Sequence, residues 1–316
     1  MLALAALLCS PVARAQGWAE VEEQDLRLAR VAERIMIANA ALCNQTMPIT
    51  GLILHSADMY GEGVAEDRFV NGPLAIASLL PGSVAANAGL QRDDAIVAIN
   101  GVATANLEPE PEGHLREAAF AVLVGASPAR AVTLSVQRAG QVIPVSLDAP
   151  RGCRSLVEIL LGDGPNALSD GRIIQLQYDF AQSLTDDQLA VAFAHELAHT
   201  VLEHRRRKTE AGIDNGSLLA NLGRHRLANR QAEIEADRLS IHLLANAGYD
   251  PAIVEQFWHS DAGSRANGSM PNFIYPTTQS RADIVALELS RYLPLRRGPT
   301  WPGHLLEWRE RGFASD

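Results

Sequence analysis

The residues best suited to carry out chemistry are two histidines and a glutamate, arranged as His195-Glu196-Leu197-Ala198-His199. Side chains four residues apart lie on one face of a helix, so the two imidazoles can bind a single zinc ion. Glu196 lies next to them, close enough to take a proton from a water molecule that the metal activates. The pattern predicts zinc-assisted hydrolysis, with one Zn²⁺ per chain and Glu196 as the general base.

A catalytic zinc ion needs a third protein ligand and one open position. Further along the chain, Glu233 and Asp237 are one helical turn apart, in a segment that is otherwise rich in apolar residues. Burying two acids on one face is costly unless a cation compensates them, whereas a solvated acidic face is the simpler alternative. We predict Glu233 as the third ligand. Glu235 lies on the opposite face, where it is expected to meet His242 and not the metal.

His204 is a poor candidate for a ligand. On a straight helix it lies nine residues from His195, about half a turn from the ligand face, so we expect it at the surface. The basic run Arg205–Lys208 follows it. Cations at a helix C-terminus explain this run best, because a chain with net charge −10 has no electrostatic footprint for nucleic acid.

The elements that must position these residues are mostly helical from about residue 150 onward. Thr185 and Gln188 match a capping box at the start of a helix over 186–207. Within that helix, Leu189, Phe193, Leu197 and Val201 recur every four residues and predict a buried stripe. We also expect helices over 226–247 and 279–292, an extended segment over 166–177, and a loop over 261–271.

The N-terminus resembles an export signal. Residues 1–8 are apolar and Ala13-Arg14-Ala15 has the form of a signal peptidase site, although no Lys or Arg precedes the apolar run. We predict a signal peptide over 1–15, with a plain N-terminal helix as the alternative. No later segment is long enough to span a membrane. Residues 18–43 show helical periodicity and predict one helix.

The cysteine count fits an exported protein. Cys9 lies inside the predicted signal peptide, which leaves Cys43 and Cys153 as an even pair in an oxidising compartment. We expect a disulfide between them, and two buried free thiols are the alternative.

Residues 50–149 have a different texture, with short β-type runs separated by the turn signals Asn100-Gly101 and Ala139-Gly140. Two short helices, near 83–88 and 113–125, fit between the runs. The expected strands are at 51–54, 74–77, 95–99, 132–136 and 142–145.

This segment resembles a PDZ domain of the type found in exported bacterial proteases. The resemblance rests mainly on Pro81–Leu90, with Arg92-Asp93-Asp94 and Ile96–Gly101 after it. Such domains add a peptide as a strand at a sheet edge and hold its terminal carboxylate with backbone N–H groups. The resemblance implies that the carboxylate loop lies near Gly51 and Leu52. A unit that only packs against the rest of the chain is the alternative.

The second half resembles the M48 family of zinc metallopeptidases, the family of Ste24 and HtpX. The resemblance is carried by residues 195–199, by Glu233–Arg238, by Ala247–Pro251 and by Pro276 followed by Arg281. It implies a zincin-type domain of the gluzincin kind, with His195, His199 and Glu233 as ligands. It also implies that Asp237 orients a ligand imidazole.

Two further features follow from the same resemblance. Asn166 and Ala167, with the strand after them, resemble the edge strand that binds substrate in this family. Many relatives have His before the Pro that corresponds to Pro276, whereas this chain has Tyr275. A tyrosine there can donate a hydrogen bond to the oxyanion of the reaction, or can simply pack.

These observations predict an α+β protein of two units. Its expected parts are a signal peptide (1–15), an N-terminal helix packed on the peptidase domain (16–49), a PDZ-like domain (50–149) and an M48-like domain (150–316). The predicted function is a soluble, periplasmic endopeptidase acting on exported or misfolded proteins, with protein or peptide partners and no nucleic acid. The alternative is a peptide-binding, chaperone-like adaptor that retains the zinc site but turns over weakly.

Overall fold

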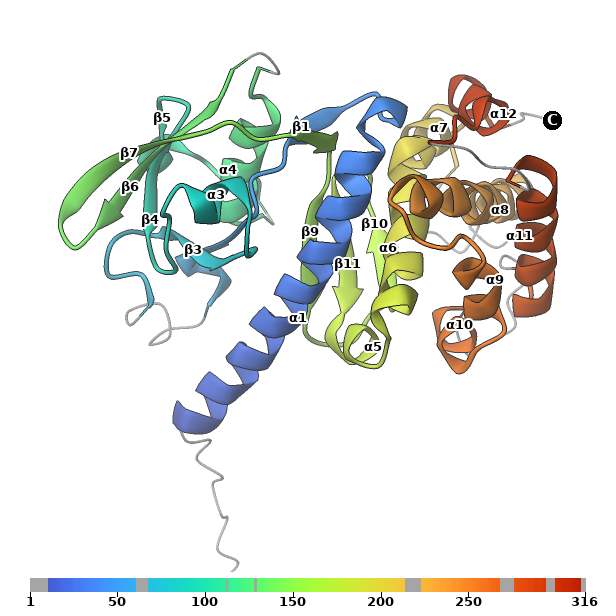
Figure 1. Ribbon diagram of the computed structural model, residues 1–316, viewed down its shortest axis with the longest axis horizontal. Helices are drawn as coiled ribbons and strands as arrows, with labels where there is room; N and C mark the ends of the chain where they lie inside the picture. The colour runs from blue at the N-terminus through green and yellow to red at the C-terminus, as the bar shows by residue number, and fades with distance from the viewer. Residues whose placement is uncertain are drawn as a thin grey trace, which may run out of the picture.

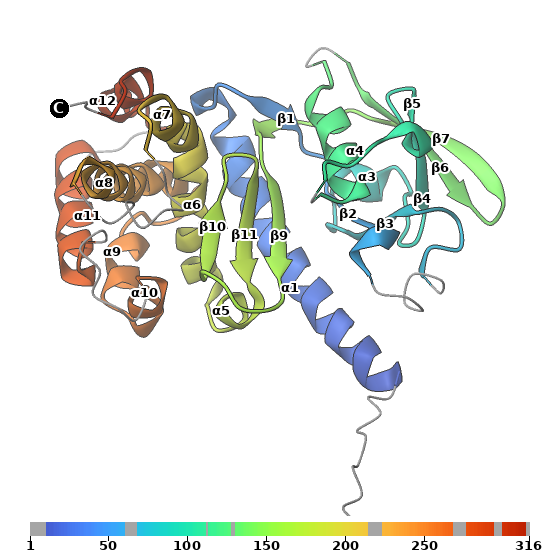
Figure 2. The ribbon, with the colours of Figure 1, turned by 180° about the vertical axis from the view of Figure 1, so that it is seen from behind.

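A computed structural model describes residues 11–60, 68–111, 113–127, 130–213, 223–267, 276–293 and 299–313, with the side chains of 11–18 left aside. The fold is mixed α+β, with a β-rich unit joined to a mostly helical body. In Figures 1 and 2, helix α1 and a small sheet lie between the β-rich unit and the helices that follow. Among the described residues, no helix is long and apolar enough to cross a membrane.

The β-rich unit is a sheet of six strands with the order β2-β3-β4-β6-β7, on which β5 pairs with β4. Two glycine turns shape it as predicted: Asn100 and Gly101 have φ of 50° and 81°, and Ala139 and Gly140 have 47° and 78°. Its elements are β2 (Leu52–Ser56), β3 (Leu74–Leu79), α3 (Val84–Asn87), β4 (Ala95–Ile99), β5 (Val102–Ala103), α4 (Leu115–Val124), β6 (Val132–Arg138) and β7 (Gln141–Leu147). Short 3-10 turns lie at Ala57–Met59 and Thr104–Asn106.

This unit has a hydrophobic core of its own. Apolar residues alternate along β6, where Val132, Leu134 and Val136 are buried, as expected for a strand that packs on one face. Ala119 of α4 and Ala85 of α3 close the same core. A second and larger cluster fills the helical body, and a small third cluster gathers Ile213, Ala228, Ala232 and Phe313 within the described part of the chain.

The β-rich unit is inserted through a short two-stranded stalk. Strand β1 (Thr46–Pro48) pairs antiparallel with β8 (Arg151–Cys153), and Thr46 lies opposite Cys153. The Cys43–Cys153 disulfide joins the same place, as predicted, with a Cα–Cα distance of 5.5 Å. Both ends of the inserted unit are therefore fastened at one point.

The helical body starts from α1 (Pro11–Ala38), which covers a three-stranded sheet of order β10-β11-β9. The predicted helix over 18–43 ends earlier than expected, at Ala38, and a 3-10 turn over Ala40–Leu42 follows. Because α1 begins at Pro11 and residues 1–10 lie outside the described residues, the signal peptide stays a prediction. The strands are β9 (Leu156–Leu160), β10 (Ala167–Ser169) and β11 (Ile173–Gln177).

Seven helices of the described part and one 3-10 turn complete the body after α5 (Tyr178–Gln182). The segment 261–271, predicted as a loop, contains a helix over 261–266, because Ser260 caps it by accepting the Gly263 N–H. The helices are α6 (Asp186–Val201), α7 (His204–Glu210), α8 (Gly223–Asn246), α9 (Ile253–Trp258), α10 (Asp261–Ala266), α11 (Thr278–Tyr292) and α12 (Gly303–Leu306), followed by the turn Glu307–Glu310.

Candidate metal centre

Helix α6 carries the His-Glu-x-x-His pattern and is fixed firmly in the body. Its N-terminus is the predicted capping box, in which Thr185 accepts the Gln188 N–H and Gln188 accepts the Thr185 N–H. The predicted stripe is buried, with Leu189, Phe193 and Leu197 wholly inaccessible to solvent. Burial of this stripe leaves the two histidines facing Glu233 of α8, and both histidines and Glu196 are half-buried.

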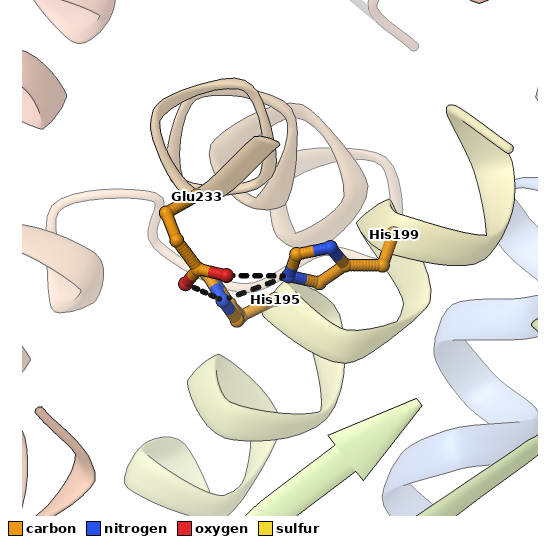
Figure 3. A group of neighbouring side chains, drawn as sticks. All are labelled: His195, His199 and Glu233. Atoms are coloured by element: carbon orange, nitrogen blue, oxygen red, sulfur yellow. Dashed lines mark hydrogen bonds and ion pairs between the residues drawn. The ribbon is translucent and has the colours of Figure 1, made fainter. Parts of the chain in front are cut away.

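The structure brings together the three predicted ligands, as Figure 3 shows. The two Nε2 atoms of His195 and His199 are 3.2 Å apart. Glu233 on α8 places one carboxylate oxygen 3.3 Å from His195 Nε2 and the other 3.6 Å from His199 Nε2. Ligand atoms about 2.0–2.1 Å from a tetrahedral zinc ion are roughly 3.3 Å from one another. The three donors therefore have the types and spacing that zinc requires.

A second group of similar residues is bonded as a hydrogen-bond network. His242, Glu288 and His304 also converge, but Glu288 Oε1 lies 3.0 Å from His242 Nε2 and 2.7 Å from His304 Nε2. The other oxygen of Glu288 accepts a hydrogen bond from Arg238 at 2.7 Å. These are hydrogen-bond distances, and together they satisfy the buried carboxylate. We read this cluster as a structural network within the body.

Asp237 lies where a residue that orients a ligand should lie. Its Oδ1 is 3.1 Å from His195 Nδ1, and the side chain is buried. Accepting the Nδ1 proton fixes the tautomer in which Nε2 is free to bind a metal. Arg281 on α11 holds Asp237 with two hydrogen bonds of 2.7 Å, and its guanidinium stacks 3.7 Å from the centre of the Trp258 ring. Arg281 therefore fixes the position of Asp237, and Asp237 in turn fixes the orientation of the His195 ring.

His204, predicted at the surface, lies inside the site, so that prediction is wrong. The helix does not run straight to residue 207: α6 ends at Val201, and Glu203 takes a left-handed conformation with φ of 52°. This break turns His204 back toward α6, and its exposure falls to 2%. Its Nδ1 lies 2.8 Å from His199 Nδ1.

Glu235 continues the same chain of contacts. The predicted meeting with His242 does not occur; Glu235 Oε2 lies 3.0 Å from His204 Nε2. Arg207, wholly buried, donates to the same oxygen at 2.6 Å. The basic run therefore belongs to a separate short helix, α7, and one of its members compensates a buried acid. If His199 binds a metal through Nε2, its Nδ1–H can donate a hydrogen bond to His204 Nδ1, and His204 Nε2–H can donate one to Glu235.

In the metal-free site, the acids stabilise positive charge on the neighbouring imidazole. Burial disfavours a charged imidazole, but the bonds to Asp237 and Glu233 outweigh it and raise the pKa of His195 to about 10. Burial keeps the pKa of His199 well below its usual value, which leaves this ring neutral. Burial also raises the pKa of Glu196 to about 7, where a carboxyl group can both take and return a proton.

Beside this site the sheet has an edge without a strand partner among the described residues. Strand β10 is the outer strand and packs against α6, where Ser169 Oγ lies 3.1 Å from Thr200 Oγ1. Asn166 O accepts the Gln177 N–H, so by alternation the backbone groups of Ala167 point away from the sheet. The Asn166 side chain, expected to face a substrate, donates to Arg265 O at 2.7 Å. A cleft of about 490 Å³ opens next to His199 at the end of β10.

Two other predicted site features remain to be placed. Tyr275 is outside the described residues. Gly51 and Leu52 lie at the start of β2 in the β-rich unit and do not contact the metal cluster. His204 and Arg207 are the residues that sequence reasoning missed, because no glycine or proline marks the helix break.

Comparison with known proteins identifies the β-rich unit. Residues 76–138 match the PDZ domain family. The match runs from β3 to the end of β6, and β2 and β7 extend the same sheet on either side. A search among curated proteins finds no match for the chain. PDZ domains bind peptides, so the chain contains a peptide-binding type of module.

Proposed function

We propose that the protein is a zinc-dependent endopeptidase that cleaves exported or misfolded proteins. The observation that carries the proposal is the convergence of three ligand atoms, 3.2–3.6 Å apart, next to a half-buried glutamate. The sequence resemblance to M48 metallopeptidases supports the same assignment. The Cys43–Cys153 disulfide supports an oxidising compartment such as the periplasm.

Each step of hydrolysis has a residue suited to it. When bound by His195, His199 and Glu233, zinc supplies a Lewis acid and makes water acidic enough to attack at neutral pH. Glu196 takes the proton of the attacking water and returns it to the leaving amine; burial of its carboxyl group raises its pKa and so strengthens it as a base. The outer edge of β10, which pairs with no other strand in the described part of the chain, holds the substrate in an extended conformation by strand addition.

A digest of an unfolded protein tests the proposal. Casein is incubated with the purified chain and with the Glu196→Gln variant, after zinc content has been measured in both. We expect both to contain one zinc ion per chain and only the native chain to produce fragments. Equal proteolysis by the two proteins would refute the role of Glu196. Full zinc occupancy in Glu233→Ala would refute the third ligand.

The PDZ match favours a second candidate, a peptide-binding adaptor that retains the metal but cleaves slowly. The same digest separates the two functions. An adaptor would bind unfolded protein and protect it from aggregation equally well with Glu196 or Gln at this position, and would release fragments only slowly compared with a working endopeptidase.

A further inference from the structure

The cleft of about 490 Å³ at the end of β10 lies on the path of a strand added to that edge. The turn after β10 forms one wall, and the end of α6 with the start of α7 forms the other. Helix α6 and strand β10 lie side by side (Figure 2), and both His199 and Thr200 line the cleft. A polypeptide that extends β10 beside the metal cluster would therefore enter this cleft at one end.

The charges around the cleft differ from those of the chain as a whole. The chain has a net charge of −10. The charged side chains that line the cleft, leaving His199 aside, are more often basic than acidic: Arg154, Arg172, Arg205 and Arg206 against Asp170, Glu203 and Glu210. This part of an acidic protein therefore has a small excess of positive charge close to the metal cluster.

Each of the three acids already has an arginine partner. Asp170 Oδ2 lies 2.8 Å from Arg205 Nη1. Glu203 Oε2 lies 2.5 Å from Arg206 Nε, and Glu210 Oε2 lies 2.9 Å from Arg206 Nη1. These pairs hold the walls of the cleft in place, and they leave none of its acids in need of a further cation.

Arg154 is the cation that these pairs leave over. Arg172 lies within ion-pair distance of Asp170, at 3.7 Å, whereas no carboxylate in the described part of the chain pairs with Arg154. The Nη2 of Arg154 lies 3.4 Å from the Gly171 carbonyl oxygen, which is long for a hydrogen bond. Its Nε is buried and has no hydrogen-bond partner among the described residues. Because buried polar groups are normally paired, the guanidinium is suited to receive an anion.

The backbone holds Arg154 firmly at this place. Its N–H donates to Gln45 O at 3.0 Å, and the preceding Cys153 is bonded to Cys43. Burial, together with the neighbouring Arg172, lowers the pKa of Arg154, but a guanidinium stays protonated in proteins. Its charge is therefore kept in a partly desolvated position at a cost in free energy, and a bound anion would offset that cost.

We propose that this cleft is a substrate subsite, in which Arg154 binds a carboxylate of the polypeptide that lies along β10. A guanidinium forms two parallel hydrogen bonds to a carboxylate, which gives direction as well as strength. In a polypeptide this group is the side chain of an acidic residue or the C-terminus. The inference rests on the proposed function, and it makes Arg154 a residue that selects acidic segments for cleavage.

Fluorescence anisotropy on the zinc-loaded full chain tests the subsite without requiring turnover. Every protein carries Glu196→Gln, so that the probes stay intact. Three labelled decapeptides share one uncharged sequence: the first has a central Glu and a C-terminal amide, the second has Gln and the amide, and the third has Gln and a free carboxylate. We expect a carboxylate probe to bind about tenfold more tightly than the uncharged second probe, as is typical of charge-assisted hydrogen bonds. Arg154→Gln should remove this preference.

The probes and a matched control separate the possible causes of a preference. Tighter binding of the first probe identifies an acidic side chain as the ligand, and tighter binding of the third identifies the C-terminus. Because a PDZ unit can also bind a free C-terminus, only the preference that Arg154→Gln removes belongs to the cleft. Arg205→Gln takes the same charge from the same cleft, but its guanidinium is paired with Asp170, so it should leave the preference unchanged.

Arg154→Lys keeps the charge without the planar fork and should retain part of the preference. Thermal melts verify that each variant is folded at the assay temperature, and if Arg154→Gln is not folded, a full preference in Arg154→Lys would refute the bidentate pairing. Equal affinities for all three probes, or equal losses in Arg154→Gln and Arg205→Gln, would overturn the proposal. Failure to cleave casein would count against the proposed function alone, because these measurements involve no cleavage. Casein cleavage without a carboxylate preference would count against the subsite alone.

Discussion

The contacts between His199, His204 and Glu235 predict that a residue outside the ligand set controls metal affinity. The perturbation is His204→Ala. It removes the ring whose Nδ1 lies 2.8 Å from His199 Nδ1 and whose Nε2 lies 3.0 Å from Glu235 Oε2. Without this partner, the Nδ1 proton and the ring orientation of His199 are no longer fixed. His204 acts through His199 and is therefore a positioning residue.

The size of the effect follows from the buried geometry. Loss of a partner that orients a ligand imidazole typically weakens metal binding by about 10–100-fold. This corresponds to about 1.4–2.8 kcal/mol, since each factor of ten equals about 1.4 kcal/mol. Glu235→Gln should have a smaller effect, because its amide oxygen can still accept from His204 while its charge toward Arg207 is lost.

The assay is competition for zinc between the protein and a chromophoric chelator at pH 7.5. His242→Ala is the matched control, because His242 is also a histidine of 2% exposure bonded to a buried glutamate, but in the other cluster. We expect both variants to lower the melting temperature and only His204→Ala to lower zinc affinity. Equal zinc affinities in the two variants would refute the reasoning, provided that both are folded in the metal-free state.

Three further predictions concern stability. Replacing Cys43 and Cys153 by serine should lower the free energy of unfolding, measured by urea denaturation, by about 4–5 kcal/mol, the chain-entropy value for a 110-residue loop. A thiol count on the unreduced native chain should find neither of these cysteines free. Arg281→Ala leaves the buried Asp237 carboxylate with His195 in place of its two guanidinium hydrogen bonds and should destabilise the metal-free protein by about 3 kcal/mol; an unchanged melting temperature would contradict this. Glu288 is buried, but its bonds to His242, Arg238 and His304 outweigh burial and lower its pKa from 4.5 to about 2. The ionised carboxylate therefore stabilises the fold by up to about 3 kcal/mol. This stabilisation is complete above pH 4.5 and is lost as the pH falls toward 2. The difference in unfolding free energy between the native chain and Glu288→Gln should therefore shrink between pH 6 and pH 3, and a constant difference would argue against it.

Local sequence predicted much of this structure because the relevant signals are short-range. Residues four apart on a helix share a face, so the placement of Glu233 beside His195 required only that two helices pack together. The strands of the PDZ unit could be predicted for the same reason. Apolar residues alternate with polar ones along a strand that is buried on one face, and Ala139-Gly140 marks the hairpin turn between β6 and β7. The capping box at Thr185 fixed one end of α6 from four residues.

The break after Val201 was not predictable in this way. A left-handed conformation at a residue other than glycine costs of the order of 1 kcal/mol and has to be held by its surroundings. Here the partners come from distant parts of the chain: Asn44 donates to Glu203 Oε1 at 2.8 Å, and Arg309 donates to the Val201 carbonyl. Neither contact leaves a trace in the sequence around residue 203. The sequence therefore could not predict the buried position of His204, which depends on this turn.

The paired strands β1 and β8 have a consequence for the history of the chain. Met47 lies opposite Gly152 in this stalk, so the polypeptide leaves the helical body and returns to it at neighbouring points. A segment with this geometry can be exchanged as a cassette, because its removal requires no new path through the body. A gene that lost the cassette would still encode both strands of the stalk and every residue of the metal cluster. The inserted β-rich unit and the cluster of His195, His199 and Glu233 could then change independently during evolution.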